Sequence, residues 1–323
     1  MLKDISLRKM SVINLNKVIM ISGPTGVGKT KTSIQLAKKI DGEIISADSM
    51  QIYQEMNIGT AKIREEETEG IKHHLIDVIS PDENFTVSDF QQRALALIDD
   101  ISNRKKVPII VGGTGLYVNS LLYDMDFQSN TVDRELRDEL LNLLEEEGKD
   151  ALFHRLQEID SKKAETIDRY NSKRVIRAIE IATYAEKNKD FSSDILPRKD
   201  MQFLLFTLYA ERKLLYERIN NRVMEMIEDG LVQEVEDLVK KYHLTEENQS
   251  MKGIGYRQVI AFLEKKISNL EMIEEIKKDS RRYAKRQLTW FRRYPFAKWI
   301  DMDQEFSVAF EDILKQTNEF LEG

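Results

Sequence analysis

The sequence contains no cysteine, and only five prolines and 14 glycines occur among its 323 residues. Without cysteine the chain can form no disulfide, thiolate metal site or cysteine nucleophile, which agrees with a reducing compartment. It has no apolar run long enough to cross a bilayer, and residues 1–16 carry charges inside every apolar stretch, unlike a signal peptide. We therefore expect a cytoplasmic protein without a membrane partner.

An overall excess of positive charge is also missing. The formal net charge is −7, with 33% charged and 41% hydrophobic residues, so the composition is that of a globular protein and does not by itself indicate a nucleic-acid partner. One segment differs, because residues 277–298 hold nine Lys or Arg, one acidic residue and five aromatics. Such a segment can contact RNA phosphates and bases, but the helical spacing of Ala284, Leu288 and Phe291 indicates that part of it is core. For Trp290 and Phe291 we favour a core position.

The most specific pattern present is a phosphate-binding loop. Gly23, Gly28, Lys29 and Thr30 fill every fixed position of G-x-x-x-x-G-K-[ST], between an apolar run and a helical pattern. Glycines let backbone amides approach an anion, Lys29 adds a charge, and Thr30 can bind Mg²⁺. The loop does not identify its ligand, because ATP, GTP and a simple diphosphate ester present the same group. The predicted anion-binding residues are Gly23, Pro24, Thr25, Gly26, Val27, Gly28, Lys29 and Thr30.

Short β-rich runs alternate with helical patterns along much of the chain, which predicts an α/β fold with a parallel sheet. The expected strands are KVIMIS from Lys17, EIISA from Glu43, VPIIV from Val107 and QFLLFTLYA from Gln202. A helix is expected from Thr86, where Thr86 and Asp89 form a capping-box pattern. Between about 124 and 200 the strand pattern gives way to charged amphipathic helices. We therefore predict an N-terminal extension (1–16), a first core part (17–123), an all-helical insertion (124–200) and a core completion with C-terminal helices (201–323).

Two residues follow strands at the edge where open parallel sheets bind ligands. Asp48 follows the second predicted strand, and there it can accept a proton, bind Mg²⁺ through water, or cap its own loop. Thr114 follows the third, in VGGTGLYVNSLL, where it can face the same anion or cap a helix. The glycines at this place count against a motor ATPase. His73 and His74 adjoin Asp77, but adjacent strand residues point to opposite faces, so we favour a structural role over a metal site.

Eight motifs occur in order from residue 23 to 293: GPTGVGKT, DSMQIY, HHLID, GGTGLY, KRVIRAIE, ERINNRVMEMIEDGLVQEV, KGIGYRQ and AKRQLTWFRR. As a set they resemble the tRNA dimethylallyltransferases. The resemblance implies a P-loop kinase-like core with a helical insertion. It also implies transfer of a dimethylallyl group from dimethylallyl diphosphate to N6 of the adenosine immediately 3′ of the anticodon in tRNA. The phosphate loop would then bind an isoprenoid diphosphate and Mg²⁺, with Thr30 as the metal ligand.

The resemblance also implies residue roles. Asp48 would be the general base, Lys29 and Arg222 would support the diphosphate, and Thr114 would lie at the reacting centre. The expected tRNA contacts are Asp48, Ser49, Met50, Gln51, Thr114, Arg137, Lys173, Arg174, Val175, Ile176, Arg177, Lys252 and Arg257. We expect a monomer. The alternatives are a P-loop kinase that uses ATP on a small acceptor, an isoprenyltransferase for free adenine nucleotides, and a nucleotide-gated RNA-binding switch.

Overall fold

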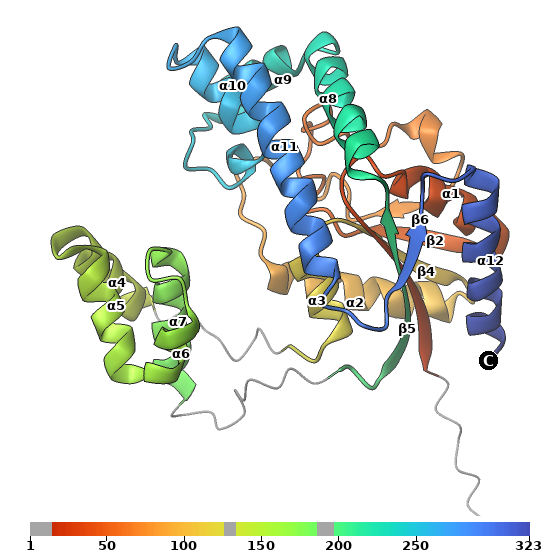
Figure 1. Ribbon diagram of the computed structural model, residues 1–323, viewed down its shortest axis with the longest axis horizontal. Coiled ribbons are helices and arrows are strands. Elements are labelled where there is room, and N and C mark those ends of the chain that lie inside the picture. The colour runs from red at the N-terminus through yellow and green to blue at the C-terminus, as the bar shows by residue number, and fades with distance from the viewer. Residues whose placement is uncertain (1–14, 126–133, 186–196) are drawn as a thin grey trace, which may run out of the picture. The chain divides into compact units, whose positions relative to one another are not determined.

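The computed structural model of the protein describes residues 15–125, 134–185 and 197–323. Six parallel strands form one sheet in the order β3-β2-β4-β1-β5-β6 (Figure 1). The strands are β1 (Asn16–Ser22), β2 (Gly42–Ser46), β3 (His73–His74), β4 (Val107–Gly112), β5 (Met201–Tyr209) and β6 (Lys298–Asp301). The sequence-based prediction of an α/β fold with a parallel sheet is therefore confirmed.

The four predicted strands correspond to β1, β2, β4 and β5, each shifted by one residue or less at its start. The strands β3 and β6 were not among them. Both stand at the edges of the sheet, and they contain only two and four residues. The first strand begins at Asn16, one residue before the predicted start of the core, while residues 1–14 of the predicted extension lie outside the described residues.

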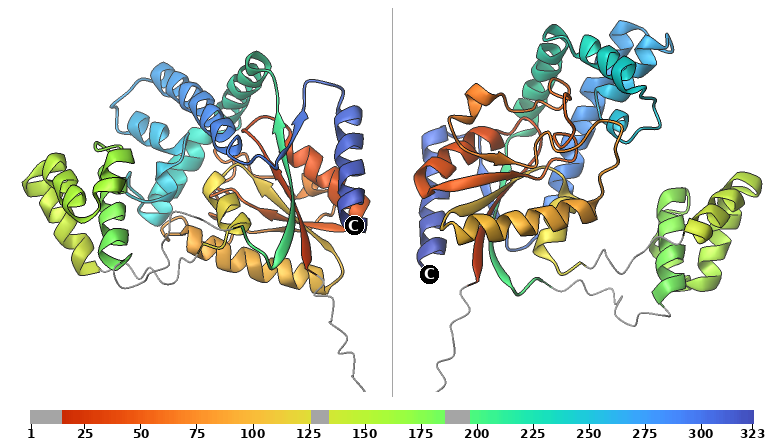
Figure 2. Two further views of the ribbon diagram at one scale, coloured as in Figure 1. Left: turned by 60° about the horizontal axis from the view of Figure 1, so that its bottom comes forward. Right: turned by 180° about the vertical axis from the view of Figure 1, so that it is seen from behind.

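Helices cover both faces of the sheet, which explains why successive residues of β1 are all apolar and buried from Val18 to Ile21. On one face Ile19 and Ile21 pack in a cluster with Ile34 of α1 (Lys29–Ile40) and Ile313 of α12 (Phe306–Glu322). The helix α2 (Val87–Asn103) lies at the other face, together with α3 (Gly115–Leu122) (Figures 1 and 2). The predicted capping box is present, since the Thr86 hydroxyl accepts a hydrogen bond from the Asp89 amide.

The chain after β5 adds helices around the carboxyl edge of the sheet. These are α8 (Arg212–Glu228), α9 (Leu231–Tyr242), α10 (Tyr256–Leu263) and α11 (Asn269–Phe291), and the short 3₁₀ helix η2 (Ser250–Lys252) precedes α10. A second 3₁₀ helix, η1 (Glu65–Thr68), lies earlier in the chain, between β2 and β3. The basic segment forms most of α11. Ala284 and Phe291 are fully buried there, as predicted, whereas Trp290 is half-buried against Gly115.

Residues 123–197 form a second compact unit, whose bounds differ by at most three residues from the predicted insertion. Its described helices are α4 (Arg134–Glu146), α5 (Gly148–Ile159), α6 (Ser161–Thr166) and α7 (Ser172–Ala185). Leu140, Leu152, Leu156, Val175 and Ile179 form its own hydrophobic core. This unit therefore has a packed core independent of the sheet.

Across the described residues of both units, every helix is too short or too polar to cross a membrane.

Candidate active site

A cavity of about 800 Å³ opens at the carboxyl edge of the parallel strands, the place where open α/β sheets bind ligands. It is lined by the phosphate loop, by the segment after β2, and by parts of α8 and α11. Four acidic residues line it: Asp48, Glu66, Glu67 and Glu69. Six basic residues from five different parts of the chain line it as well: Lys29, Lys31, Arg222, Lys252, Arg257 and Arg286. This excess of cations suits a polyanionic ligand.

The phosphate loop has the backbone that its glycines predict. Gly28 adopts a φ of 101° immediately before α1, and a Cβ on Gly23 would lie 2.6 Å from the Leu208 carbonyl oxygen. The Lys29 Nζ donates hydrogen bonds to the carbonyl oxygens of Gly23 (3.0 Å) and Pro24 (2.8 Å). Burial lowers the pKa of Lys29 to about 8, the charge of Asp48 opposes that shift, and Arg222 adds to it. The three predicted charged residues are thus close enough to interact.

Asp48 lies in the cavity and also caps its own loop. Its Oδ1 accepts hydrogen bonds from the amides of Met50 (2.9 Å) and Gln51 (3.4 Å). Of the roles that the sequence left open, the loop cap is present, and the same residue lies close enough to Lys29 for their charges to interact.

Thr114 joins the segment after β2 to the turn after β4. Its Oγ1 accepts a hydrogen bond from the Ser49 amide (3.1 Å) and donates one to the Ser49 hydroxyl (3.3 Å). Ser49 lines the cavity, whereas Thr114 is not among the lining residues, so Thr114 lies behind Ser49 rather than in the cavity itself. The side chain of Thr114 therefore holds the segment after β2 against the turn after β4.

A carboxylate that sequence reasoning missed holds the next part of this segment. Glu234 of α9 accepts hydrogen bonds from the three successive amides of residues 57–59, at 2.7 to 3.1 Å, and from the Tyr256 hydroxyl at 2.7 Å. The Gln51 side-chain amide donates to the carbonyls of residues 60 and 61, at 3.3 Å each. Glu234 lies in the quoted motif GLVQEV, but nothing in the sequence pairs it with residues 57–59.

The helix α11 supplies further residues that were missed. The buried Gln287 accepts a hydrogen bond from the Thr25 amide (3.0 Å) and donates one to the Gly113 carbonyl (3.1 Å). Tyr283, four residues earlier, lines the cavity, and burial together with the Asp48 charge raises its pKa to about 12. Both lie in the segment interpreted from the sequence as basic RNA-contacting surface. An uncharged glutamine among Lys and Arg was the available signal.

Arg222 of α8, which the sequence predicts to support the diphosphate, lines the cavity. Arg218 stands one helical turn earlier, beside the phosphate loop: a Cβ on Gly26 would lie 3.9 Å from the Arg218 Cβ. Arg218 therefore lies beside the phosphate loop, and Arg222 lies in the cavity wall.

The predicted tRNA contacts separate into two groups. Ser49, Met50, Gln51, Lys252 and Arg257 line the cavity of the core unit. Within that group, Arg257 forms an ion pair with Asp279 at 2.6 Å and Lys252 one with Glu247 at 3.4 Å. Ion pairs with neighbouring carboxylates therefore hold these two cations in place at the cavity.

The remaining predicted contacts lie in the insertion. Lys173 and Arg174 are exposed on α7, but Arg137 and Arg177 each form an ion pair at 3.0 Å with the buried Glu180. The side chains of Val175 and Ile176 are buried in the core of the insertion, so the prediction that they contact tRNA needs correction: their apolar side chains pack inward. The exposed face of α7 is cationic, and its inner face is hydrophobic.

The histidine pair takes part in a structural cluster. The His74 Nε2 lies 2.8 Å from Glu43, which also pairs with Arg104 at 2.5 Å. His73 Nδ1 bonds to the Ile71 carbonyl at 2.8 Å. These partners agree with the structural role that the sequence favours.

The described residues contain no group of three or more His, Cys, Asp or Glu side chains arranged to hold a metal ion. Thr30 is exposed in the first turn of α1, beside Lys29 and the cavity. This donor set fits Mg²⁺ only if phosphate oxygens and water complete its coordination, which is how Mg²⁺ commonly binds with phosphate substrates.

A family model described as IPP transferase matches residues 51–294. Two proteins named tRNA dimethylallyltransferase are close to the chain in sequence. That of Clostridioides difficile is 48% identical over 304 residues, which make up 94% of this chain and 96% of that one. That of Alkaliphilus metalliredigens is 50% identical over 301 residues, covering 93% and 96%.

Two solved structures share the fold. The tRNA isopentenylpyrophosphate transferase of Bacillus halodurans is 42% identical, with a TM-score of 0.73 and coverage of 95% of this chain and 97% of that one. A eukaryotic dimethylallyltransferase acting on tRNA is 31% identical, with a TM-score of 0.83 and coverage of 95% and 80%. The similarity extends over both units and includes the P-loop core.

Proposed function

Because the chain belongs to the tRNA dimethylallyltransferase family, we propose that it transfers a dimethylallyl group from dimethylallyl diphosphate to N6 of the adenosine immediately 3′ of the anticodon in tRNA. Diphosphate is the second product. The observation that carries this assignment is the common cavity of Lys29, Asp48 and Arg222 beside the phosphate loop. The cavity combines an anion site, a carboxylate and cations for RNA, which the reaction requires together.

The diphosphate binds at the phosphate loop, from Gly23 to Thr30. Negative charge grows on the leaving oxygen as the allylic carbon–oxygen bond breaks, and the Lys29 ammonium and the loop amides stabilise that charge. Arg222 contacts the same group from α8. Thr30, with diphosphate oxygens and water, would hold Mg²⁺, which supplies further neutralisation of the diphosphate when bound.

Asp48 accepts the proton that the reaction releases. The adenine N6 amine attacks the allylic carbon, a carbon–nitrogen bond forms, and the amine loses one proton. Both hydrogen bonds that hold the Asp48 loop use Oδ1, so Oδ2 is the oxygen that takes the proton. Thr114 fixes the neighbouring Ser49 through two hydrogen bonds and thereby holds this segment in place.

The target base must leave the anticodon-loop stack to reach a cavity at the sheet edge. Lys252, Arg257 and Arg286 at the cavity bind the phosphates around that base, and Lys173 and Arg174 of the insertion provide further phosphate contacts. One chain carries all these residues, so we propose that a monomer is active. Since tRNA is the proposed substrate, we propose that the reaction takes place in the cytoplasm.

The test is incubation of the protein with unmodified tRNA, Mg²⁺ and dimethylallyl diphosphate in the absence of ATP, followed by mass analysis of the tRNA nucleosides. One N6-dimethylallyl adenosine per tRNA is expected, with one diphosphate released. The Lys29→Ala variant should bind tRNA normally and form product much more slowly. Consumption of ATP coupled to an acceptor, with no modified nucleoside, would support the kinase alternative instead.

A further inference from the structure

A second cavity of about 560 Å³ lies outside the candidate active site. It is formed by the end of β5, the start of α8, the C-terminal half of α11 and β6. Three aromatic and three basic side chains contribute to its wall: Tyr209, Tyr216, Trp299, Arg212, Lys285 and Arg292. Its volume is within the range of small-molecule sites.

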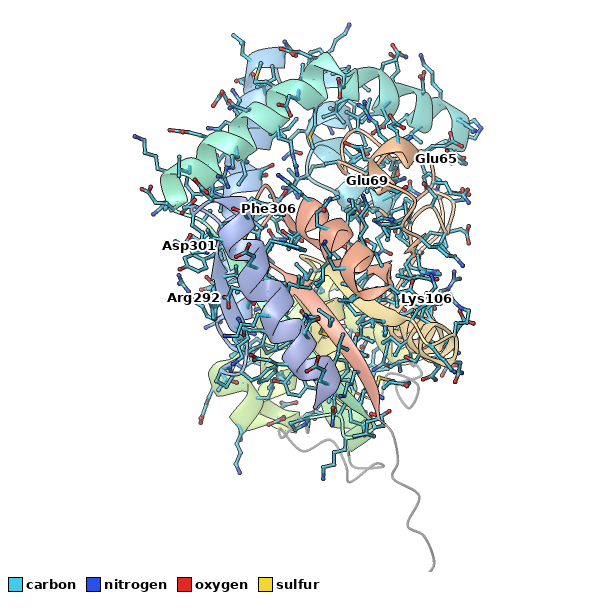
Figure 3. The ribbon with its side chains drawn as sticks, turned by 90° about the vertical axis from the view of Figure 1, so that its right-hand side faces the viewer. Glu65, Glu69, Lys106, Arg292, Asp301 and Phe306 are labelled. Carbon is cyan, nitrogen blue, oxygen red and sulfur yellow. The ribbon has the colours of Figure 1, made fainter. Side chains whose placement is uncertain are left out.

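The cations of this cavity are unpaired. Arg212, Lys285 and Arg292 form no ion pair with a carboxylate in the part of the chain that the structure describes, although 21 such pairs occur there. All three are exposed. Three acidic residues flank this lining. Glu211 directly precedes Arg212, and its amide donates a hydrogen bond to Asp303. Asp301, on the same side of the ribbon as Arg292 (Figure 3), interacts with Tyr209. The lining residues themselves include no carboxylate.

A carboxylate already stands at the start of α8. This 17-residue helix begins at Arg212 and has no side-chain hydrogen bond that caps its first turn. The Asp303 carboxylate accepts a hydrogen bond from the preceding amide, that of Glu211. A phosphate group in this cavity would therefore be bound by the three cations rather than by the helix dipole.

The aromatic rings supply a surface for a base. Tyr209 and Trp299 meet edge to face, with ring centroids 6.0 Å apart, and the Arg212 guanidinium lies over the Tyr216 ring at 5.1 Å. Trp299 is 36% exposed, so part of the indole is accessible. Aromatic and guanidinium planes are the groups on which proteins stack unpaired bases.

The helix α11 connects the two cavities. Tyr283, Arg286 and Gln287 line the candidate active site, whereas Lys285, Leu288, Thr289 and Arg292, at helical spacing, line the second cavity. The basic segment of the sequence thus serves two sites, one on each side of this helix.

We propose that the second cavity binds a nucleotide, with its phosphate at Arg212, Lys285 and Arg292 and its base against Trp299 and the two tyrosines. The nucleotide is either an unpaired residue of the bound tRNA or a free mononucleotide, which have the same chemistry. Only the tRNA source rests on the proposed function.

Trp299 reports on the site directly, because Trp290 is the one other tryptophan. Tryptophan fluorescence of the wild type is compared with that of Trp299→Phe during titration with tRNA and, separately, with AMP. A quench that occurs in the wild type and disappears in Trp299→Phe is expected. If tRNA alone produces it, the source is a tRNA residue; if AMP produces it and competes with tRNA, the site also takes free nucleotides. Equal responses of the two proteins to both ligands would overturn the proposal.

A double variant tests the phosphate contacts. Lys285→Ala/Arg292→Ala should weaken tRNA binding by roughly tenfold and reduce the slope of log affinity against log salt by about 1 to 2. The matched control is Lys278→Ala/Arg282→Ala, which removes two exposed cations from the same helix outside both cavities. Equal effects of the two double variants on both tRNA binding and AMP binding would contradict a specific site. Transfer measured at saturating tRNA separates this result from the proposed function, since it should persist in both variants.

Discussion

The backbone amide of Thr25 in the phosphate loop donates its hydrogen bond to the side chain of Gln287, 262 residues later in the chain, at 3.0 Å. The same side chain donates to the Gly113 carbonyl, and a Cβ on Gly113 would lie 2.0 Å from the Gln287 Nε2. One buried glutamine therefore fixes the phosphate loop relative to the turn after β4.

Replacement of Gln287 by methionine should impair the anion site. The change keeps a similar volume but leaves the Thr25 amide and the Gly113 carbonyl without their partner, at a cost of about 1–3 kcal/mol for each buried group. We expect the dissociation constant of dimethylallyl diphosphate to rise by about tenfold or more, as measured by calorimetry. The control is Gln316→Met, which removes an exposed hydrogen bond on α12 and should leave the constant unchanged. An unaltered constant in Gln287→Met would show that the loop holds its shape alone.

The lowered pKa of Lys29 predicts how diphosphate binding depends on pH. In the free protein Lys29 is charged below about pH 8 and becomes neutral above it, because burial lowers its pKa to about 8. Binding above that pH requires uptake of a proton, so affinity should fall by up to about tenfold per pH unit. A Lys29→Arg variant keeps its charge and should lack this inflection. Identical profiles of the two proteins from about pH 6.5 to 9.5 would exclude Lys29 as the titrating group.

The buried Glu43 should make stability sensitive to acid. Hydrogen bonds from Arg104, with smaller contributions from His74 and Lys106, lower the pKa of Glu43 from 4.5 to about 2. The charged form is therefore favoured by folding, so its stabilisation is complete above about pH 4.5 and is lost as the pH falls towards 2. The size of the effect is about 3 kcal/mol.

Urea unfolding at several pH values measures this effect. Glu43→Gln should lower the free energy of unfolding at neutral pH by roughly 2–3 kcal/mol and flatten its decline between about pH 4.5 and 2. Glu69→Gln, which breaks an exposed pair with Lys38, should change it by less than about 1 kcal/mol. If both variants change the free energy of unfolding equally, the cluster around Glu43 does not stabilise the fold more than an exposed ion pair does.

Local patterns in the sequence predicted most of the fold. The strands β1, β2, β4 and β5 were found because each is a short apolar run next to a helical pattern, and the insertion because that alternation stops. The edge strand β3 has only two residues, and β6 begins inside a basic and aromatic segment, so neither has a pattern of its own. Short edge strands depend on pairing with a neighbour, which a single sequence does not display.

The site was predictable where function follows from a local motif. The phosphate loop and Asp48 stand directly after strands, so the fold alone brings them together. Gln287 and Glu234 act through hydrogen bonds to segments 262 and about 175 residues away, and no periodicity marks such a bond. Val175 and Ile176 show the opposite error, because a motif that contains exposed cations also contains the apolar residues that hold them in place.

The exposed cations of α7 should contribute to tRNA affinity through phosphate contacts. Lys173→Ala/Arg174→Ala is expected to reduce the slope of log affinity against log salt by about 1 to 2 without unfolding the insertion. Arg177 is left in place, since its ion pair with the buried Glu180 supports the insertion itself. Arg155→Ala/Lys162→Ala, on α5 and α6, removes the same charge as a control. A slope that does not change in the first variant would mean that these two cations do not contact RNA.

Single-turnover transfer by Asp48→Asn, with saturating unmodified tRNA and dimethylallyl diphosphate and without ATP, tests the central claim most directly. Asparagine keeps the shape of Asp48 and an acceptor for the Met50 amide, but it cannot take the amine proton. We predict a rate about 10²- to 10⁴-fold lower than that of the wild type, with tRNA and diphosphate affinities and the melting temperature nearly unchanged. A stable Asp48→Asn protein that transfers at the wild-type rate would contradict the account, because Asp48 would then only cap its loop.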